Sequence, residues 1–418
     1  MYHLYSALFS GLLVIGLPYL LYRSLREKGY ARSLSERFAL ADRALVAPKE
    51  PPIWIHAVSV GEVLAVATLL PSLKNAFPDT PVIVSVITVT GRQVAADKLV
   101  GVDAVFYCPF DLAFLVRRVV AKMRPRALVV METELWPHLL REARRAGAVT
   151  MVANGRISDG SFPRYQAIAG VMKHYLEQVD LFCMQDELYA ERIAALGAPA
   201  EKIKLTGSLK FDGLPQASSR DGRVFPEGRR ILVCGSTLAG EEAALLSIFE
   251  SLREDYPDLF LVIAPRHAPR FDEVYQLARG RGLRVARRSS PRVAAADTDV
   301  LILDTLGELA SLYREADYVF VGGSLADKGG HNIIEPASEG KPVLFGPHMQ
   351  NFADIARSFL EAEAVLQVED AAALEAALRE LIENPDKGRA LGERARRVVE
   401  EKRGASERTT AALKELLA

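Results

Sequence analysis

The 418-residue sequence predicts an α/β protein with two doubly wound parallel-sheet domains behind an apolar N-terminal helix. Two series of short β-branched runs alternate with amphipathic segments, and a stretch without periodicity separates the two series. Half of the residues are hydrophobic and a quarter are charged. Each half of the chain therefore has enough apolar side chains to form a core of its own.

The N-terminal segment is apolar and long enough to reach across a bilayer. From Leu4 to Tyr22 there is no charge, and at about 1.5 Å per residue this run covers roughly the 30 Å hydrocarbon core. Arg23 and Arg26 follow the run instead of preceding it, which predicts an anchor that leaves the rest of the chain in the cytoplasm. Pro18 weakens a straight spanning helix, so a helix lying in the bilayer surface and a buried first helix stay open as alternatives.

The expected strands divide the remaining chain into two domains. The first series covers residues 53–59, 82–88, 104–108, 127–131, 150–153, 181–184 and 203–206, and the second covers 231–234, 260–264, 300–303, 318–321, 342–345 and 365–368. The stretch between them collects Gly, Pro and Ser, which indicates a linker. We expect an anchor at residues 1–22, a first domain at 23–212, a linker at 213–230, and a second domain at 231–418 closed by helices in the last fifty residues.

Charge and cysteine content exclude several classes of protein. With 52 basic and 53 acidic residues the net charge is −1, so we expect no nucleic-acid partner. Cys108, Cys183 and Cys234 lie far apart in apolar runs, which predicts buried thiols and no disulfide framework. No HExxH motif and no Cys/His cluster with ligand spacing occurs, so we expect no metal site.

Three candidate residues of the first domain follow predicted strands, at the edge where open α/β sheets bind ligands. Glu62 is a candidate general base or, alternatively, a carboxylate that only stabilises a helix N-terminus. Glu132 follows the fourth strand and either orients a cation or hydroxyl or is a solvated cap. Lys210 precedes the linker and can bind a carboxylate or phosphate.

The second domain has a pattern typical of anion binding. Arg266 follows a strand and offers a guanidinium group to a phosphate. The glycine-rich segments Gly322–Ser324 and Gly329–Glu335 lead to a helix N-terminus, where free N–H groups favour a phosphate and Glu335 can accept hydrogen bonds from ribose hydroxyls. Neither segment is GxGxxG or a Walker A motif, which excludes ordinary dinucleotide dehydrogenases and P-loop proteins.

Taken in order, these segments resemble the 3-deoxy-D-manno-octulosonic acid (Kdo) transferases of lipopolysaccharide synthesis. The resemblance covers nearly the whole chain and rests on His56–Glu62, Thr88–Gly91, Pro109–Asp111, Met131–Pro137, Asn154–Ser158, Gly207–Asp212, Val321–Leu325 and Gly329–Glu335. It implies the GT-B fold, in which two Rossmann-like domains face each other across a cleft. Gly155 replaces a common alanine, and Ile333 with Ile334 replaces a common Pro-Leu pair.

The resemblance also implies a reaction and its residues. Kdo would move from CMP-Kdo to a lipid A precursor (lipid IVA) with inversion, using Glu62 as proton acceptor and Glu132 with Lys210 to stabilise the transition state. Lys210 would hold either the Kdo carboxylate or the leaving phosphate. The residues implied to bind CMP are Pro265, Arg266, Leu306, Gly307, Glu308, Asn332, Ile333, Ile334 and Glu335. No metal or other cofactor is expected, because protein donors would meet the leaving phosphate.

The implied acceptor is a membrane lipid, which agrees with an anchor in the inner membrane and catalytic domains on the cytoplasmic side. Three basic clusters, 117–118, 141–145 and 279–292, are candidate contacts with anionic lipids or, alternatively, solvated helix faces. Two other interpretations stay open: another GT-B protein that prefers UDP, and a membrane-tethered module that only binds a nucleotide. The number of Kdo residues transferred is also open.

Overall fold

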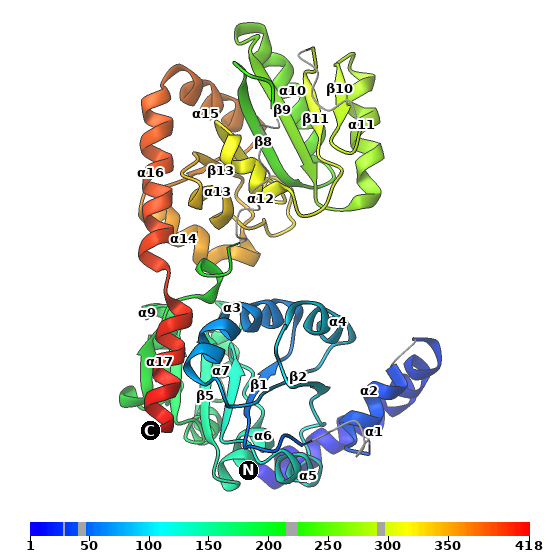
Figure 1. Ribbon diagram of the computed structural model, residues 1–418, viewed down its shortest axis with the longest axis vertical. Helices are drawn as coiled ribbons and strands as arrows, with labels where there is room; N and C mark the ends of the chain where they lie inside the picture. The colour runs from blue at the N-terminus through cyan, green and yellow to red at the C-terminus, as the bar shows by residue number, and fades with distance from the viewer. Residues whose placement is uncertain (28–29, 41–46, 215–224, 291–296) are drawn as a thin grey trace. The chain divides into compact units, whose positions relative to one another are not determined.

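The computed structural model describes residues 1–27, 30–40, 47–214, 225–290 and 297–418. The chain forms two compact units (Figure 1). Unit 1 comprises Met1–Gly213 and Arg403–Ala418, and unit 2 comprises Leu214–Lys402. Each unit contains a seven-stranded parallel sheet, which confirms two doubly wound domains.

Unit 1 has the strand order β3-β2-β1-β4-β5-β6-β7. Its strands are β1 (Ile53–Ala57), β2 (Val82–Val86), β3 (Ala104–Tyr107), β4 (Ala127–Met131), β5 (Val149–Gly155), β6 (Leu181–Met184) and β7 (Ile203–Leu205). Its helices are α1 (Tyr2–Arg26), α2 (Tyr30–Arg37), α3 (Val60–Ala76), α4 (Val89–Lys98), α5 (Ala113–Met123), α6 (Pro137–Arg145), α7 (Phe162–Gln166), α8 (Ala169–Leu176), α9 (Glu187–Ala195) and α17 (Ala405–Leu417). The central strands β1, β2 and β4 are buried throughout, because helices cover both faces of a parallel sheet.

Unit 2 has the strand order β10-β11-β9-β8-β12-β13-β14. Its strands are β8 (Arg230–Thr237), β9 (Leu259–Pro265), β10 (Val285–Arg287), β11 (Val300–Ile302), β12 (Tyr318–Val321), β13 (Val343–Phe345) and β14 (Leu366–Gln367). Its helices are α10 (Glu241–Asp255), α11 (Phe271–Gly280), α12 (Leu309–Leu312), α13 (Ile334–Ser338), α14 (Ala353–Glu361), α15 (Ala371–Glu383) and α16 (Pro385–Lys402). The predicted strands are present, and most of the predicted linker, residues 215–224, lies outside the described residues.

The strand order of each sheet contains one reversal that favours ligand binding. In unit 1, β1 lies between β2 and β4. The strands that follow β1 in the chain are therefore added first on one side of it and then on the other. In unit 2, β8 lies between β9 and β12 in the same way. Ligands of open α/β sheets bind at such switch points, outside the carboxyl ends of the strands. Residues that follow β1, β4, β8 and β12 are therefore placed where chemistry is expected.

The last helix departs from the expected domain boundary. We predicted that residues 231–418 form the second domain, but α17 packs on unit 1, against α3 and β5. Leu413 is buried in the core of unit 1, and the Asp212 carboxylate accepts hydrogen bonds from the Gly404 and Ser406 amides at 2.8 and 2.7 Å. An amphipathic sequence shows that a helix has an apolar face, but it does not show which core that face covers.

One strand and the three cysteines complete the comparison with the sequence. The strand β10 (Val285–Arg287) was not predicted, because it lies at a sheet edge in an arginine-rich stretch and its residues are only half-buried. The three cysteines are buried and unpaired, as predicted.

The N-terminal helix α1 is long and apolar enough to cross a membrane by length and composition. Figure 1 shows α1 beside α2, and the two helices are in contact. Half-buried residues recur along one face of α1 at helical spacing, and the large side chains of its other face, among them Leu12 and Ile15, are exposed. One face of α1 therefore contacts unit 1, and the other is apolar and uncovered.

Candidate active site

Glu62 lies at the switch point of unit 1, at the third position of α3. Ser59 is the N-cap residue, and its hydroxyl accepts a hydrogen bond from the Glu62 amide, while the Glu62 carboxylate accepts from the Ser59 amide at 3.1 Å. This reciprocal capping box explains why α3 begins here. The same carboxylate accepts hydrogen bonds from the Val58 amide at 2.8 Å and the Ser59 hydroxyl at 2.7 Å. Both carboxylate oxygens are thus held in place.

The surroundings of Glu62 raise its proton affinity. Glu62 is only 4% exposed, and burial raises its pKa to about 7 despite the hydrogen bonds from Val58 and Ser59. The nearby carboxylates of Glu132 and Glu134 act in the same direction. A carboxylate with a pKa near neutrality is suited to accept a proton near pH 7. Helix capping and proton transfer are thus compatible at this residue.

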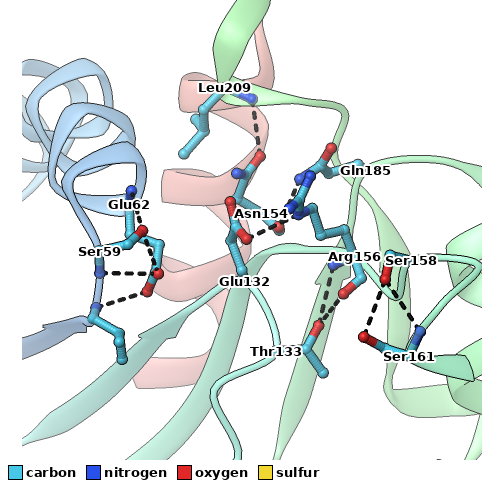
Figure 2. Close-up of polar contacts among 11 residues, drawn as sticks. Ser59, Glu62, Glu132, Thr133, Asn154, Arg156, Ser158, Ser161, Gln185 and Leu209 are labelled. Atoms are coloured by element: carbon cyan, nitrogen blue, oxygen red, sulfur yellow. Dashed lines mark hydrogen bonds and ion pairs between the residues drawn. The ribbon is translucent and has the colours of Figure 1, made fainter. Parts of the chain in front are cut away.

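Glu132 directly follows β4 and is held by an ion pair. Its backbone has φ of 55°, a conformation that non-glycine residues adopt rarely, and its amide donates to the Ala153 carbonyl at 2.8 Å. The Arg156 guanidinium contacts the Glu132 carboxylate at 2.9 Å. Figure 2 shows this pair beside Asn154 at the same edge of the sheet as Glu62. Arg156 lies within a motif that the sequence analysis noted, but it was assigned no function there.

Asn154 connects the end of β5 to the turn that contains Lys210. It is buried, has φ of 55°, and accepts a hydrogen bond on its side-chain oxygen from the Leu209 amide at 3.1 Å (Figure 2). Its carbonyl accepts from the Gln185 side-chain amide at 2.9 Å. Leu209 begins the 3₁₀ turn Leu209–Phe211, which packs on α3. Asn154 therefore positions the backbone next to Lys210, a function that sequence analysis missed.

In unit 2, a side chain occupies part of the loop that we predicted to bind phosphate. The Glu241 carboxylate, 1% exposed, accepts hydrogen bonds of 2.8 to 3.3 Å from the amides of Leu238, Gly323, Ser324, Leu325 and Ala326. These N–H groups are therefore satisfied by the protein and are not open to a phosphate. The expectation for Gly322–Ser324 was wrong, because the sequence does not reveal that Glu241 at the start of α10 folds into this loop.

The second glycine-rich segment lies close to Arg266. Arg266 is exposed after β9, and its charge lowers the pKa of His331 and opposes the rise in the pKa of Glu335 that burial causes. Asn332 donates a hydrogen bond to the Glu335 carboxylate at 3.2 Å and accepts one from the Ile334 amide at 3.0 Å. Arg266 follows β9, Asn332 precedes α13, and Glu335 lies in the first turn of α13.

His331 directly precedes Asn332 and is a residue that sequence analysis missed. Burial, followed by the charges of Arg266 and His267, lowers its pKa to about 4, so the ring is neutral near pH 7. Its Nε2 atom is buried without a hydrogen-bond partner among the described residues. A neutral ring in this position adds no charge to the site.

The remaining predicted nucleotide-binding residues differ in exposure. Ile333 and Ile334 are fully buried in the core and Pro265 is buried, so their side chains do not face solvent. Leu306 is 79% exposed and Gly307 has φ of 83°. Glu308 pairs with Arg288 at 2.7 Å. Within the described parts of the chain, no three His, Cys, Asp or Glu side chains form a group suited to a metal ion.

Comparisons with known proteins identify the family of the chain. Residues 32–213 match the family "3-Deoxy-D-manno-octulosonic-acid transferase (kdotransferase)", and residues 221–398 match "Glycosyl transferases group 1". A 3-deoxy-D-manno-octulosonic acid transferase of Haemophilus influenzae is 34% identical over 94% of this chain and 93% of its own. A transferase of the same name from Bordetella pertussis is 35% identical over 91% of each chain.

The chain belongs to the Kdo transferase family. It is a glycosyltransferase, and its two Rossmann-like domains are of the GT-B type. Among solved structures, UDP-GlcNAc 2-epimerase from Neisseria meningitidis matches with a TM-score of 0.61 over 88% of this chain and 99% of its own, at 14% identity. That likeness concerns the fold alone.

Within this Kdo transferase, the structure brings the predicted residues into two separate groups. Unit 1 holds Glu62 and Glu132 on either side of its switch point, and the turn with Lys210 packs on the helix that Glu62 begins. Unit 2 holds Arg266 near Glu335. The residue assignments themselves stay predictions, because they rest on this geometry and on the family resemblance.

Proposed function

We propose that this Kdo transferase moves Kdo from CMP-Kdo to a hydroxyl group of a lipid A precursor such as lipid IVA, with inversion at the anomeric carbon. The observation that carries the proposal is the buried Glu62 carboxylate, fixed at the switch point with its pKa raised to about 7. The names of the relatives from Haemophilus influenzae and Bordetella pertussis support the proposal that the transferred sugar is Kdo.

In the proposed reaction, Glu62 accepts the proton of the attacking acceptor hydroxyl. The hydroxyl oxygen forms the new bond to the anomeric carbon while the bond from that carbon to the CMP phosphate oxygen breaks. CMP departs with the bonding electron pair. Attack on the face opposite the leaving group inverts the configuration. Arg156 holds Glu132 in place, and Lys210 offsets the charge of the Kdo carboxylate or of the leaving phosphate.

Unit 2 is proposed to bind CMP through the group around Arg266. The exposed guanidinium offers paired donors to the phosphate, and Glu335, the second residue of α13, would accept hydrogen bonds from ribose hydroxyls. Asn332 orients Glu335 through the hydrogen bond of 3.2 Å. We propose that protein donors alone offset the charge on the leaving phosphate, without a metal ion or other cofactor.

We further propose that the protein acts at the inner membrane, with both units on the cytoplasmic side. The uncovered apolar face of α1 supports association with a bilayer. The arginines that follow its apolar run favour the cytoplasmic side.

A transfer assay tests this function. Purified protein in detergent is given CMP-Kdo and a tetra-acylated, phosphorylated glucosamine disaccharide, and the product is analysed by mass and by anomeric configuration. We expect the acceptor to gain Kdo with inverted configuration, and the number of increments to give the number of transfers. Product formed only from UDP-sugars contradicts the donor, and CMP binding without any product contradicts the enzymatic assignment.

A further inference from the structure

The first half of α1 is fixed on unit 1 by polar and aromatic contacts. Ser6 Oγ lies 2.7 Å from Nε2 of His138, at the start of α6. The Tyr2 ring packs against the rings of His138 and Tyr175 with centroids 5.6 Å apart, and the Arg141 guanidinium lies 4.3 Å from the Tyr2 ring centroid. A helix that served only to anchor the chain in lipid would not need these contacts.

The docking of α1 leaves an apolar groove of about 540 Å³ between α1, α8 and the segment after Glu132. Leu4, Leu8 and Phe9 line it from α1, and Ile168 and Val171 line it from the opposite side. Ile168 is 49% and Val171 36% exposed, so the groove presents uncovered apolar surface. Its volume is in the range of about 300 to 1,000 Å³ that small-molecule sites occupy.

The groove reaches the candidate active site. Thr133 and Glu134, which follow Glu132 directly, belong to its lining. The Glu134 carboxylate is close enough to Glu62 to contribute to the raised pKa of that residue. A ligand in the groove therefore contacts residues that directly follow Glu132 in the chain.

A second cavity, of about 590 Å³, meets the groove at Met1 and is cationic. It is lined by Tyr2, Arg141, Arg144 and Arg145 together with two histidines, and no carboxylate is among the described residues that line it. Among the described residues that line the cavity, the charged side chains are therefore arginines.

Carboxylates behind this cavity pair with its arginines, and one carboxylate is shared by several of them. Glu142 is shared by Arg141 at 3.6 Å, Arg145 at 3.1 Å and Arg117 at 2.9 Å. Asp180 lies 3.4 Å from Arg144, and Glu177 lies 3.8 Å from His174. In the part of the chain that the structure describes, the Tyr2 hydroxyl oxygen is buried without a hydrogen-bond partner, and Arg141 Nε has no partner nearer than the Glu142 carboxylate at 3.6 Å. Both atoms are donors that an anion would satisfy.

We propose that α1 forms one wall of the acceptor site: an acyl chain of a phosphorylated glycolipid lies in the apolar groove, and a phosphate of the same molecule lies in the arginine cavity. This proposal rests on the proposed function, and it adds that the protein recognises an acyl chain and a phosphate of the acceptor. An apolar groove joined to a cationic cavity fits an acylated, anionic lipid and does not fit a soluble sugar. Bulk phospholipid is the competing occupant.

Two tryptophan substitutions on α1 test the groove. Leu8→Trp fills it, whereas Leu12→Trp adds the same ring to an exposed position that does not line it. With the tetra-acylated acceptor, we expect Leu8→Trp to raise the acceptor KM about tenfold and Leu12→Trp to leave it unchanged. With the de-O-acylated acceptor, wild type and Leu8→Trp should be equal. Both variants should bind vesicles as wild type does.

The phosphate contact is tested by Arg141→Gln, with the exposed Arg124→Gln as control. We expect Arg141→Gln to raise the KM of the bisphosphorylated acceptor about tenfold and to have no effect on an acceptor without phosphate. The CMP-Kdo KM should not change. An equal effect on both acceptors overturns the phosphate assignment.

The outcomes separate this inference from the proposed function. Transfer by wild type with an unchanged acceptor KM in Leu8→Trp overturns the groove while the function stands. Loss of vesicle binding in Leu8→Trp but not in Leu12→Trp overturns it too, because the groove would then contact bulk lipid. No transfer by wild type to either acceptor contradicts the proposed function itself.

Discussion

At the scale of single residues, Glu62 caps the N-terminus of α3 and is also the proposed proton acceptor. The hydrogen bonds from Val58 and Ser59 fix its carboxylate, and such bonds alone would lower its pKa. Burial outweighs them and raises the pKa to about 7. A base that is fixed in position and half-ionised near neutral pH needs little reorganisation to accept a proton.

Transfer activity is expected to rise with pH. Only the deprotonated Glu62 accepts a proton, so below its pKa of about 7 kcat/KM should increase about tenfold per pH unit, and above it the profile should level off. The measurement is the pH profile of kcat/KM for the acceptor at saturating CMP-Kdo. A profile that is flat through neutrality contradicts the assignment of Glu62.

Arg156→Gln is expected to lower kcat about 10- to 100-fold, because Glu132 loses the guanidinium that orients it. The affinity for CMP should not change, since the variant lies in unit 1. Arg164→Gln, an exposed arginine on α7, serves as the control. Steady-state kinetics with both variants provide the comparison, and equal kcat values would contradict a function for the Glu132–Arg156 pair.

At the scale of elements, two strands of unit 1 end in strained residues. Glu132 after β4 and Asn154 in β5 both have φ of 55°. Such a conformation costs about 1–3 kcal/mol in a non-glycine residue and is retained mainly at functional sites. Hydrophobic patterns predicted where these strands lie but carried no information on their backbone angles. The hydrogen bond from the Leu209 amide to the Asn154 side chain was therefore not predicted.

The position of α17 makes a prediction about stability. Leu413→Ala should lower the free energy of unfolding of unit 1 by about 2–5 kcal/mol, because it removes a buried side chain from that core. Trp54 and Trp136 are the only tryptophans of the chain and both lie in unit 1, so their fluorescence reports on this unit during urea unfolding.

The matched control for Leu413 is Leu391→Ala, which removes a buried leucine from α16 in unit 2. This variant should not change the urea concentration at which the tryptophan fluorescence reports unfolding. If only the Leu391 variant shifted that transition, the assignment of α17 to unit 1 would be contradicted.

At the scale of the whole molecule, the sequence predicted both sheets and the edges that hold the candidate site. Periodicity identified the buried strands, and Glu62 and Glu132 were found because they directly follow such strands. Glu241 was not predicted, because its interaction with residues 323–326 depends on contacts between segments far apart in the chain. The same reason applies to Arg156 and to α17. Local patterns predict elements, whereas contacts between distant segments become visible only in the folded chain.

The most direct test of the account compares single-turnover transfer by wild type and Glu62→Gln. Glutamine retains the capping box with Ser59, so α3 should stay intact while the base is lost. Asp186→Asn, at the N-cap of α9, is the control, because it also replaces a capping carboxylate with an amide in unit 1. We predict that Glu62→Gln binds CMP like wild type but transfers Kdo at least about 100-fold more slowly. Transfer by this variant at the wild-type rate would contradict the account.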